Sequence, residues 1–157
     1  MSRFGVTFVE ITATVLIMGI LASVAVPVYS NSLLRYRTEV TAQRIAQDIV
    51  QTQRIARQTN STRTILFTLV DNSLEISGIS SMDHAGQPYK VYFDQVPFRT
   101  MFSSLVTAAQ PATQLPSVAL DFDRFGMPNQ GISVTVQAGT IQKRVDVTPI
   151  TGRVSVQ

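Results

Sequence analysis

The residue of greatest chemical interest is Glu10, a carboxylic acid set among apolar residues near the start of the chain. No further charged side chain follows it until Arg35. A charged side chain costs roughly 2.5–3.5 kcal/mol at the centre of a membrane helix, and less near the helix end. Glu10 is therefore a functional candidate, and its surroundings predict a cationic partner that neutralises it.

Side chains that support catalysis or metal binding are scarce. The 157 residues include no cysteine and one histidine, His84, which excludes a thiolate site and a multi-histidine metal site. His84 lies beside Asp83 with no candidate nucleophile nearby. Asp121 and Asp123 alternate with apolar residues, as strand and turn residues do. We therefore expect no enzymatic activity and no cofactor.

The element that positions Glu10 is a long apolar segment. Between Glu10 and Arg35 the sequence reads ITATVLIMGILASVAVPVYSNSLL. As a helix this segment is about 36 Å long, enough to cross a hydrocarbon core of about 30 Å. Arg3 precedes the segment, and Arg35 and Arg37 follow it, so the positive-inside rule gives little orientation.

Three interpretations of this segment compete. The first is an ordinary signal anchor. The second is a secretory signal peptide that is cut at the small-residue site Ser23-Val24-Ala25. The third depends on the residues that precede the segment. The first two leave Glu10 unexplained.

The third interpretation comes from the residues before the apolar segment. Arg3-Phe4-Gly5-Val6-Thr7-Phe8-Val9-Glu10 resembles the prepilin leader of type IV pilins and pseudopilins. In that family a short basic leader ends in glycine, and the fifth residue of the mature chain is glutamate. Gly5 and Glu10 match these positions, whereas Val6 replaces the usual phenylalanine.

The resemblance implies a processing event and an assembly contact. A prepilin peptidase cuts after Gly5 and N-methylates the new amine on Val6, and Glu10 pairs with the N-terminal amine of a neighbouring subunit. Glycine leaves the scissile backbone unobstructed. Because a buried ion pair adds little net stability while an unpaired charge is costly, Glu10 is expected to set axial register.

Gly19 and Pro27 fall where the family often carries a glycine and a proline. Proline removes one helical hydrogen bond and kinks the axis. Two interpretations stay open: a plain kink, or a weak stretch from Gly19 to Pro27 that unwinds when the filament assembles.

The helical pattern continues from Thr38 to Gln58 as an amphipathic segment, which Asn60-Ser61 ends. We expect an apolar stripe to pack on a sheet, made of Ala42, Ile45, Ala46, Ile49, Val50 and Ala56. We expect a solvated face made of Arg44, Gln47, Asp48, Gln51, Arg54 and Arg57.

After Ser61 the apolar period changes to two, which indicates strands. The predicted strands are Thr64–Val70, Leu74–Ile79, Tyr89–Phe93, Val118–Phe122, Ile132–Ala138, Ile141–Thr148 and Arg153–Val156. Gly139-Thr140 predicts a tight hairpin turn. Within Pro97–Pro116, we expect Thr100–Ala109 to be a short helix or a mobile insertion.

The predicted fold class is α+β, with a long N-terminal helix packed on an antiparallel β-sheet head. Residues 1–5 are the expected leader and 6–34 the transmembrane half of the helix. Residues 35–60 are its amphipathic soluble half, and 61–157 the β-rich extracytoplasmic head.

Within the superfamily the chain is similar to minor pilins and pseudopilins of the GspH/FimT type. The helix end Arg54-Ile55-Ala56-Arg57 leads into the first strand. Asp123-Arg124-Phe125-Gly126-Met127-Pro128 resembles the family's glycine and proline turn, and Thr151-Gly152-Arg153-Val154 its closing pattern. We expect Gly126 and Gly152 to permit turns.

Some relatives of the FimT type bind DNA through arginines near the C-terminus. Here Lys143, Arg144 and Arg153 form the candidate phosphate-binding patch. Ser155 stands where that pattern has a second arginine, and Asp146 lies beside the patch. A net charge of +3 does not by itself imply nucleic-acid binding.

The resemblance thus implies a structural subunit of the bacterial inner membrane that primes or caps a type II secretion pseudopilus or a type IV pilus. Its implied partners are the prepilin peptidase, other pilins or pseudopilins, and membrane lipid. The alternative is a DNA-binding minor pilin for natural transformation. The sequence does not distinguish a type II secretion pseudopilus from a type IV pilus or from a natural-transformation system.

Overall fold

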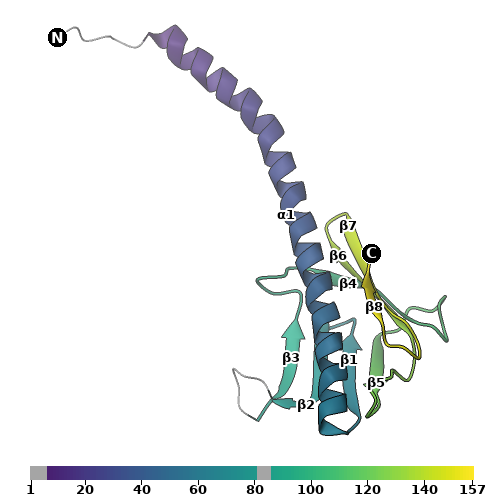
Figure 1. The fold of residues 1–157 in the computed structure, drawn as a ribbon. Coiled ribbons are helices and arrows are strands. Elements are labelled where there is room, and N and C mark those ends of the chain that lie inside the picture. Colours follow the sequence, from purple (N-terminus) through teal and green to yellow (C-terminus); the bar gives the residue numbers. More distant parts are fainter. Residues whose placement is uncertain (1–6, 81–85) are drawn as a thin grey trace. The chain divides into compact units, whose positions relative to one another are not determined.

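The structure is a computed structural model that describes residues 7–80 and 86–157. Its contacts divide the chain into two compact units, one that ends at Leu34 and one from Arg35 to Gln157, which we call the head unit. A single α-helix, α1 (Phe8–Thr59), contributes to both units (Figure 1). Gly5, Val6, Asp83 and His84 lie outside the described residues.

Helix α1 ends where the sequence predicts. Asn60 adopts a left-handed conformation with φ of 50°. The N–H of Ser61 donates to the carbonyl oxygen of Ala56 at 3.2 Å, and that of Asn60 donates to the carbonyl oxygen of Arg57 at 3.4 Å. These two bonds form a Schellman cap, which satisfies carbonyl groups that the helix itself leaves free.

The helix stripe in the head unit is largely the predicted one. Ala42, Ile45, Ile49 and Ala56 are fully buried. Ala46 and Val50 are half-buried, and they line a groove of about 610 Å³ beside Val154.

The head unit adds eight strands among the described residues. They are β1 (Arg63–Thr68), β2 (Ser73–Ser80), β3 (Pro88–Tyr92), β4 (Met101–Thr107), β5 (Ser117–Phe122), β6 (Ile132–Ala138), β7 (Ile141–Val147) and β8 (Val154–Val156). They form two antiparallel sheets, with strand orders β3-β2-β1-β5 and β4-β6-β7-β8. The predicted α+β class is therefore confirmed, with two sheets in the head.

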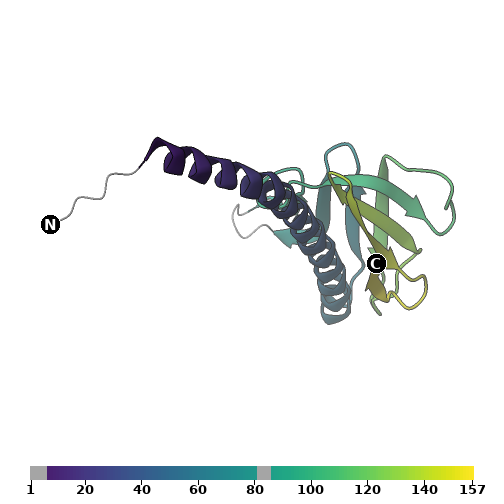
Figure 2. The same cartoon turned by 90° about the horizontal axis from the view of Figure 1, so that it is seen from above.

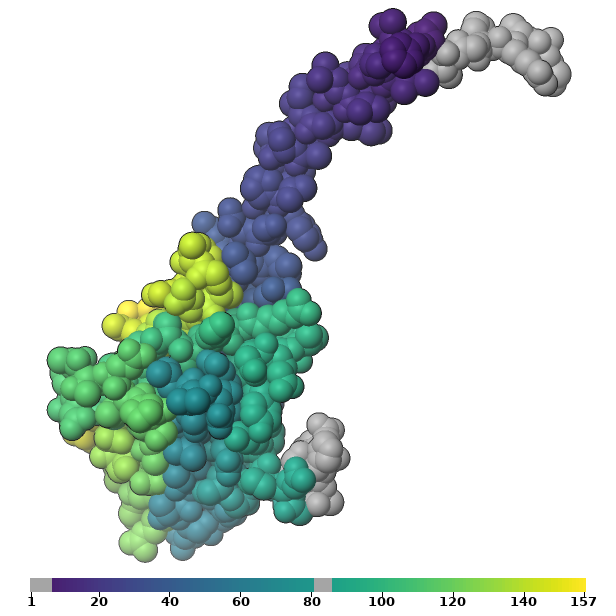
Figure 3. Space-filling view, turned by 180° about the vertical axis from the view of Figure 1, so that it is seen from behind, coloured from purple at the N-terminus to yellow at the C-terminus, as the bar shows by residue number. Residues whose placement is uncertain are grey.

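One core of buried side chains joins α1 to both sheets. Figures 1 and 2 show the part of α1 in the head unit running alongside the strands. The first sheet contributes Ile65, Phe67, Leu74 and Leu120, among others, and the second contributes Leu105, Val134, Val136 and Val145. In the view from behind, strand and loop residues form the surface of the head (Figure 3).

The β6–β7 hairpin confirms the predicted turn. Ala138 pairs with Ile141, so Gly139 and Thr140 form the two-residue connection. Gly139 has a φ of 58°, which glycine adopts without steric cost.

The prediction for Thr100–Ala109 is wrong, because Met101–Thr107 forms strand β4 and pairs with β6. The register shifts between Phe102 and Ser104, which marks a β-bulge. The bulge places the buried Phe102 and Leu105 three residues apart instead of two. This spacing imitates one turn of a helix, and it explains why the period of two was not visible.

Candidate functional site

The predicted cleavage and methylation site, Gly5 and Val6, lies outside the described residues, so both modifications stay predictions. Thr7, the first described residue, caps the N-terminus of α1. Its Oγ1 accepts a hydrogen bond from the backbone N–H of Glu10 at 3.3 Å, and its carbonyl oxygen accepts from the same N–H at 3.1 Å.

Glu10 therefore lies in the first turn of α1, where the helix dipole favours a carboxylate. The spacing of Thr7 and Glu10 is that of a capping box, a signal that our sequence analysis did not use. Glu10 is exposed and lines a shallow pocket of about 270 Å³ with Ile11, Thr14 and Val15. Within the described part of the chain its carboxylate has no ion-pair partner.

The first half of α1 is long and apolar enough to cross a membrane, with a mean hydropathy of 2.3 over its best 18-residue window. Its large apolar side chains, from Phe8 to Tyr29, are between 52% and 81% exposed. Among the described residues, no side chain buries this half of the helix.

Gly19 and Pro27 both lie inside α1. A Cβ added at Gly19 would meet no heavy atom within 4 Å beyond the helix's own backbone. Close packing against residues 7–80 and 86–157 thus does not explain this glycine, although glycine weakens a helix by about 1 kcal/mol relative to alanine.

Two glycine turns of the head are held by polar side chains of α1. Arg57 Nε donates to the carbonyl oxygen of Phe125 at 2.7 Å, and Gln53 Nε2 donates to the carbonyl oxygen of Gly152 at 2.7 Å. Gln53 and Arg57 are one helical turn apart, so they share a face. They anchor the two C-terminal motifs, an arrangement that our sequence analysis missed.

Both predicted turn glycines have left-handed backbones, with φ of 75° at Gly126 and 64° at Gly152. A Cβ at Gly126 would lie 2.4 Å from Arg57 Nε, and one at Gly152 would lie 2.2 Å from Gln53 Nε2. These glycines are therefore required by conformation and by the approach of the helix side chains.

Asp121 and Asp123 have structural roles in the same region. Asp123 Oδ1 accepts from the backbone N–H of Phe125 at 2.9 Å and from that of Met127 at 2.8 Å. Asp121 accepts from the Thr64 hydroxyl at 2.6 Å. Among the described residues, no three His, Asp or Glu side chains form a group suited to a metal ion.

Lys143 and Arg144 of the predicted basic patch do not share one surface of the head. Lys143 and Arg144 are neighbours on β7, so their side chains point to opposite faces of the sheet. Lys143 Nζ pairs with Glu39 at 3.3 Å, and Arg144 Nε pairs with Asp146 at 2.9 Å. Arg153 is exposed just before β8.

The sequence analysis placed Asp48 on a solvated face, and this prediction is wrong. The Asp48 side chain is only 2% exposed. Its Oδ2 pairs with Arg44 Nε at 3.2 Å, and Arg44 also donates to the Tyr89 hydroxyl. Burial raises the pKa of Asp48, and the hydrogen bonds and charge of Arg44 only partly offset this.

Solved structures with the same architecture identify the fold. The minor type IV pilin FimU of Pseudomonas aeruginosa superposes with a TM-score of 0.52, at 14% identity, over 78% of this chain and 90% of FimU. The minor pseudopilin EpsH from the type 2 secretion system of Vibrio cholerae superposes with a TM-score of 0.51, at 12% identity, over 77% of this chain and 96% of EpsH.

This chain has a type IV pilin-like fold. No profile of a known protein family matches the sequence, and no curated protein sequence matches it. At these identities the likeness establishes the fold alone. The similarity extends over most of both solved chains.

Proposed function

We propose that this chain is a minor pilin or pseudopilin, a non-catalytic subunit that primes or caps a type IV pilus or a type II secretion pseudopilus. The observation that carries the proposal is the exposed apolar half of α1, with one carboxylate in its first turn, joined to a head of pilin-like fold.

The apolar half of α1 requires a partner that water does not supply. Burial of apolar side chains contributes roughly 25 cal/mol for each Å² removed from water. Lipid provides this environment before assembly, and the helices of neighbouring subunits provide it in a filament. We propose that the subunit passes from the inner membrane to the filament, with the head outside the cytoplasm throughout.

Leader cleavage supplies the charge that Glu10 lacks within the described chain. Cutting between Gly5 and Val6 creates a new amine at Val6, which prepilin peptidase also methylates in this proposal. In a filament that amine pairs with Glu10 of a neighbouring subunit. An ion pair in apolar surroundings penalises any register that separates the two charges.

Gly19 and Pro27 support a local weakness in the same helix. Glycine raises the cost of helix formation, and proline cannot donate to the carbonyl oxygen four residues earlier. We propose that this stretch unwinds when the subunit enters the filament.

The alternative of DNA uptake has less support. Its candidate cations Lys143 and Arg144 are each paired with a carboxylate, and their side chains point to opposite faces of β7.

The mass of the intact protein extracted from membranes tests the proposal. A methylated chain that begins at Val6 is the expected product. A chain that begins at Val26, after the Ser23-Val24-Ala25 site, would show an ordinary secreted protein and would refute the proposal. An uncut chain in the presence of active prepilin peptidase would refute it too.

A further inference from the structure

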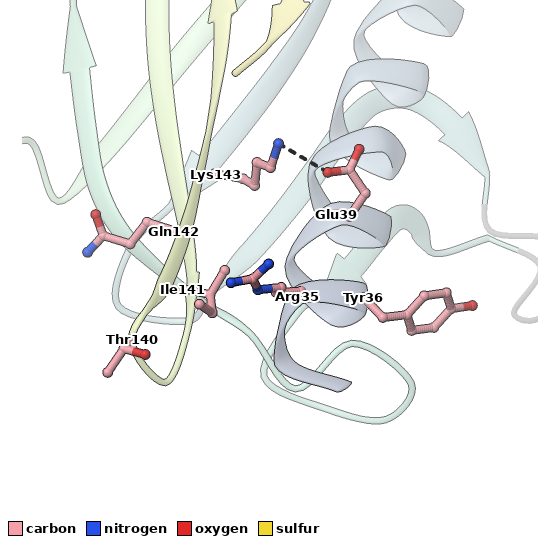
Figure 4. A pocket seen from close by; sticks show the side chains of 7 residues that line it. All are labelled: Arg35, Tyr36, Glu39, Thr140, Ile141, Gln142 and Lys143. Atoms are coloured by element: carbon pink, nitrogen blue, oxygen red, sulfur yellow. Dashed lines mark ion pairs between the residues drawn. The ribbon is translucent and has the colours of Figure 1, made fainter. Parts of the chain in front are cut away.

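A pocket of about 620 Å³ opens between the first turns of α1 in the head unit and the β6–β7 hairpin (Figure 4). Arg35, Tyr36 and Glu39 line it from the helix. Thr140, Ile141 and Lys143 line it from the hairpin. Cavities of this size commonly hold small ligands or the head of a larger molecule.

The pocket carries one more positive charge than negative. Lys143 Nζ reaches Glu39 Oε2 at 3.3 Å, so these two charges neutralise each other. Hydrogen bonds from Gln43 and Lys143 lower the pKa of Glu39, which keeps its carboxylate ionised. Arg35 has no ion-pair partner within residues 7–80 and 86–157. Its guanidinium extends toward the hairpin beside Ile141 (Figure 4).

The sequence position of Arg35 indicates what kind of anion it meets. Arg35 directly follows Leu34, the last residue of the apolar segment, in the same helix. At about 1.5 Å per residue, Arg35 to Glu39 cover roughly the next 8 Å along the helix axis. The headgroup layer outside each face of the hydrocarbon core is about 5–7 Å thick. The pocket of a membrane-spanning α1 thus begins at the depth of the lipid phosphates.

We infer that this pocket binds the phosphate of an anionic phospholipid in the extracytoplasmic leaflet. Arg35 binds the phosphate oxygens, because a guanidinium presents two parallel donors to such a group. Lys143 supplies a second cation next to it. Tyr36, 67% exposed, belongs to the residue class that is enriched at the headgroup level.

This inference rests on the proposed function, because it requires that α1 crosses the membrane. It adds a lipid-dependent contact of the head with the membrane surface. Glu39 competes with the phosphate for Lys143. When no lipid is bound, the Glu39 carboxylate is the anion that pairs with Lys143. A subunit that leaves the membrane can therefore release the lipid without stranding the Lys143 ammonium.

Native mass spectrometry of the full-length protein in detergent tests the inference, with phosphatidylglycerol and phosphatidylcholine as separate probes. The wild type should retain phosphatidylglycerol in preference to phosphatidylcholine. Arg35→Gln should lower this retention at least roughly tenfold, the effect of losing one charge-assisted hydrogen-bond pair. Glu39→Gln should raise retention, because it frees Lys143 for the phosphate.

Arg37→Gln is the matched control, since Arg37 carries the same charge on the same helix but does not line the pocket. Its retention should stay within about twofold of the wild type. Equal losses from Arg35→Gln and Arg37→Gln would reduce the site to general attraction and overturn the inference. Equal retention of the two lipids would overturn it as well, as would lower retention in Glu39→Gln.

Two further outcomes separate this inference from the proposed function. Lipid-free dimers that Arg35→Gln converts to monomers would assign the pocket to a second copy of the chain and overturn the lipid site. A membrane-extracted protein that begins at Val6 but has no lipid preference would overturn only the lipid site. A protein absent from the membrane fraction would overturn both.

Discussion

Arg57 donates a hydrogen bond from Nε to the backbone carbonyl oxygen of Phe125 at 2.7 Å, across 68 positions of sequence. This contact connects the last turns of α1 to the glycine turn after β5. One helical turn earlier, Gln53 makes the equivalent bond to Gly152, across 99 positions. The end of the helix therefore holds both C-terminal turns, and the stability of these contacts can be measured.

Gly126→Ala should lower the free energy of unfolding by roughly 1–3 kcal/mol. Alanine is strained at this left-handed backbone position. Its Cβ would also lie 2.4 Å from Arg57 Nε, so it would displace the hydrogen bond from Arg57 to Phe125. Thermal unfolding of the protein in detergent measures the loss. Gly86→Ala is the control, because Gly86 has a φ of 89° and open space around it. Equal losses in the two variants would mean that the Arg57 contact contributes nothing.

Gln53→Ala should destabilise the protein by roughly 1–3 kcal/mol, because the carbonyl oxygen of Gly152 loses its donor in a buried place. Gln51→Ala, at an exposed position of the same helix, should change stability by no more than about 0.5 kcal/mol. Unfolding by urea measures both variants. A Gln53→Ala protein as stable as Gln51→Ala would contradict the anchoring role.

Asp48→Asn should remove a pH dependence of stability. Burial raises the pKa of Asp48 above its ordinary value of 3.8, so the folded state holds this proton to a higher pH than the unfolded state. The stability from this group is therefore complete below 3.8 and is lost as the pH rises through the raised pKa.

Unfolding experiments from about pH 4 to about pH 7 check this sign. The stability of Asp48→Asn relative to the wild type should rise across the lower part of that range and then level off. Asp94→Asn, at an exposed position, provides the matched control and should follow the wild type. A relative stability of Asp48→Asn that falls with rising pH would contradict the assignment.

Glu10→Gln should leave leader cleavage and the head intact but exclude the subunit from filaments. The amide keeps the backbone N–H that Thr7 caps, so only the charge is lost. The amount of subunit in the sheared filament fraction measures the effect, and we expect a loss of at least roughly tenfold for an unpaired buried charge.

Thr7→Val separates capping from charge, because it removes the Oγ1 acceptor and keeps the Glu10 carboxylate. This variant should enter filaments much more readily than Glu10→Gln. Equal exclusion of the two variants would assign the effect to helix capping.

A gel shift with the purified protein at low salt should show no DNA binding, because Lys143 and Arg144 are paired and point to opposite faces of β7. A shift that weakens with salt and disappears in Arg153→Gln would support DNA uptake instead.

Strand β4 shows where sequence periodicity stops being informative. The bulge between Phe102 and Ser104 changes the spacing of buried residues from two to three, and pairing with β6 stabilises the resulting strand. Strands β5, β6 and β7 keep a regular alternation, so they were predictable from the sequence. Strand β2 was predicted too, although its register with β3 shifts between Ile76 and Ser80. The separation of Lys143 from Arg144 was also predictable, because neighbouring residues of a strand point to opposite faces.

Asp48 illustrates the other limit. Its place in the helical repeat puts it within the buried stripe that includes Ile45, Ile49 and Thr52, yet its charge indicated a solvated face. In the folded protein Asp48 forms an ion pair with Arg44 and accepts a hydrogen bond from the Tyr89 hydroxyl. Tyr89 lies on β3, 41 positions away in the sequence.

By itself, the sequence determined the apolar helix, the position of Glu10, the amphipathic second half and most of the strands. These features follow from local composition and period, which act over a few residues at a time. The tertiary structure alone decided the bulged β4, the contact of Asp48 with Tyr89, the anchoring by Gln53 and Arg57, and the pocket at Arg35. Each of these depends on groups that are far apart in the chain and meet only when the helix and both sheets pack together.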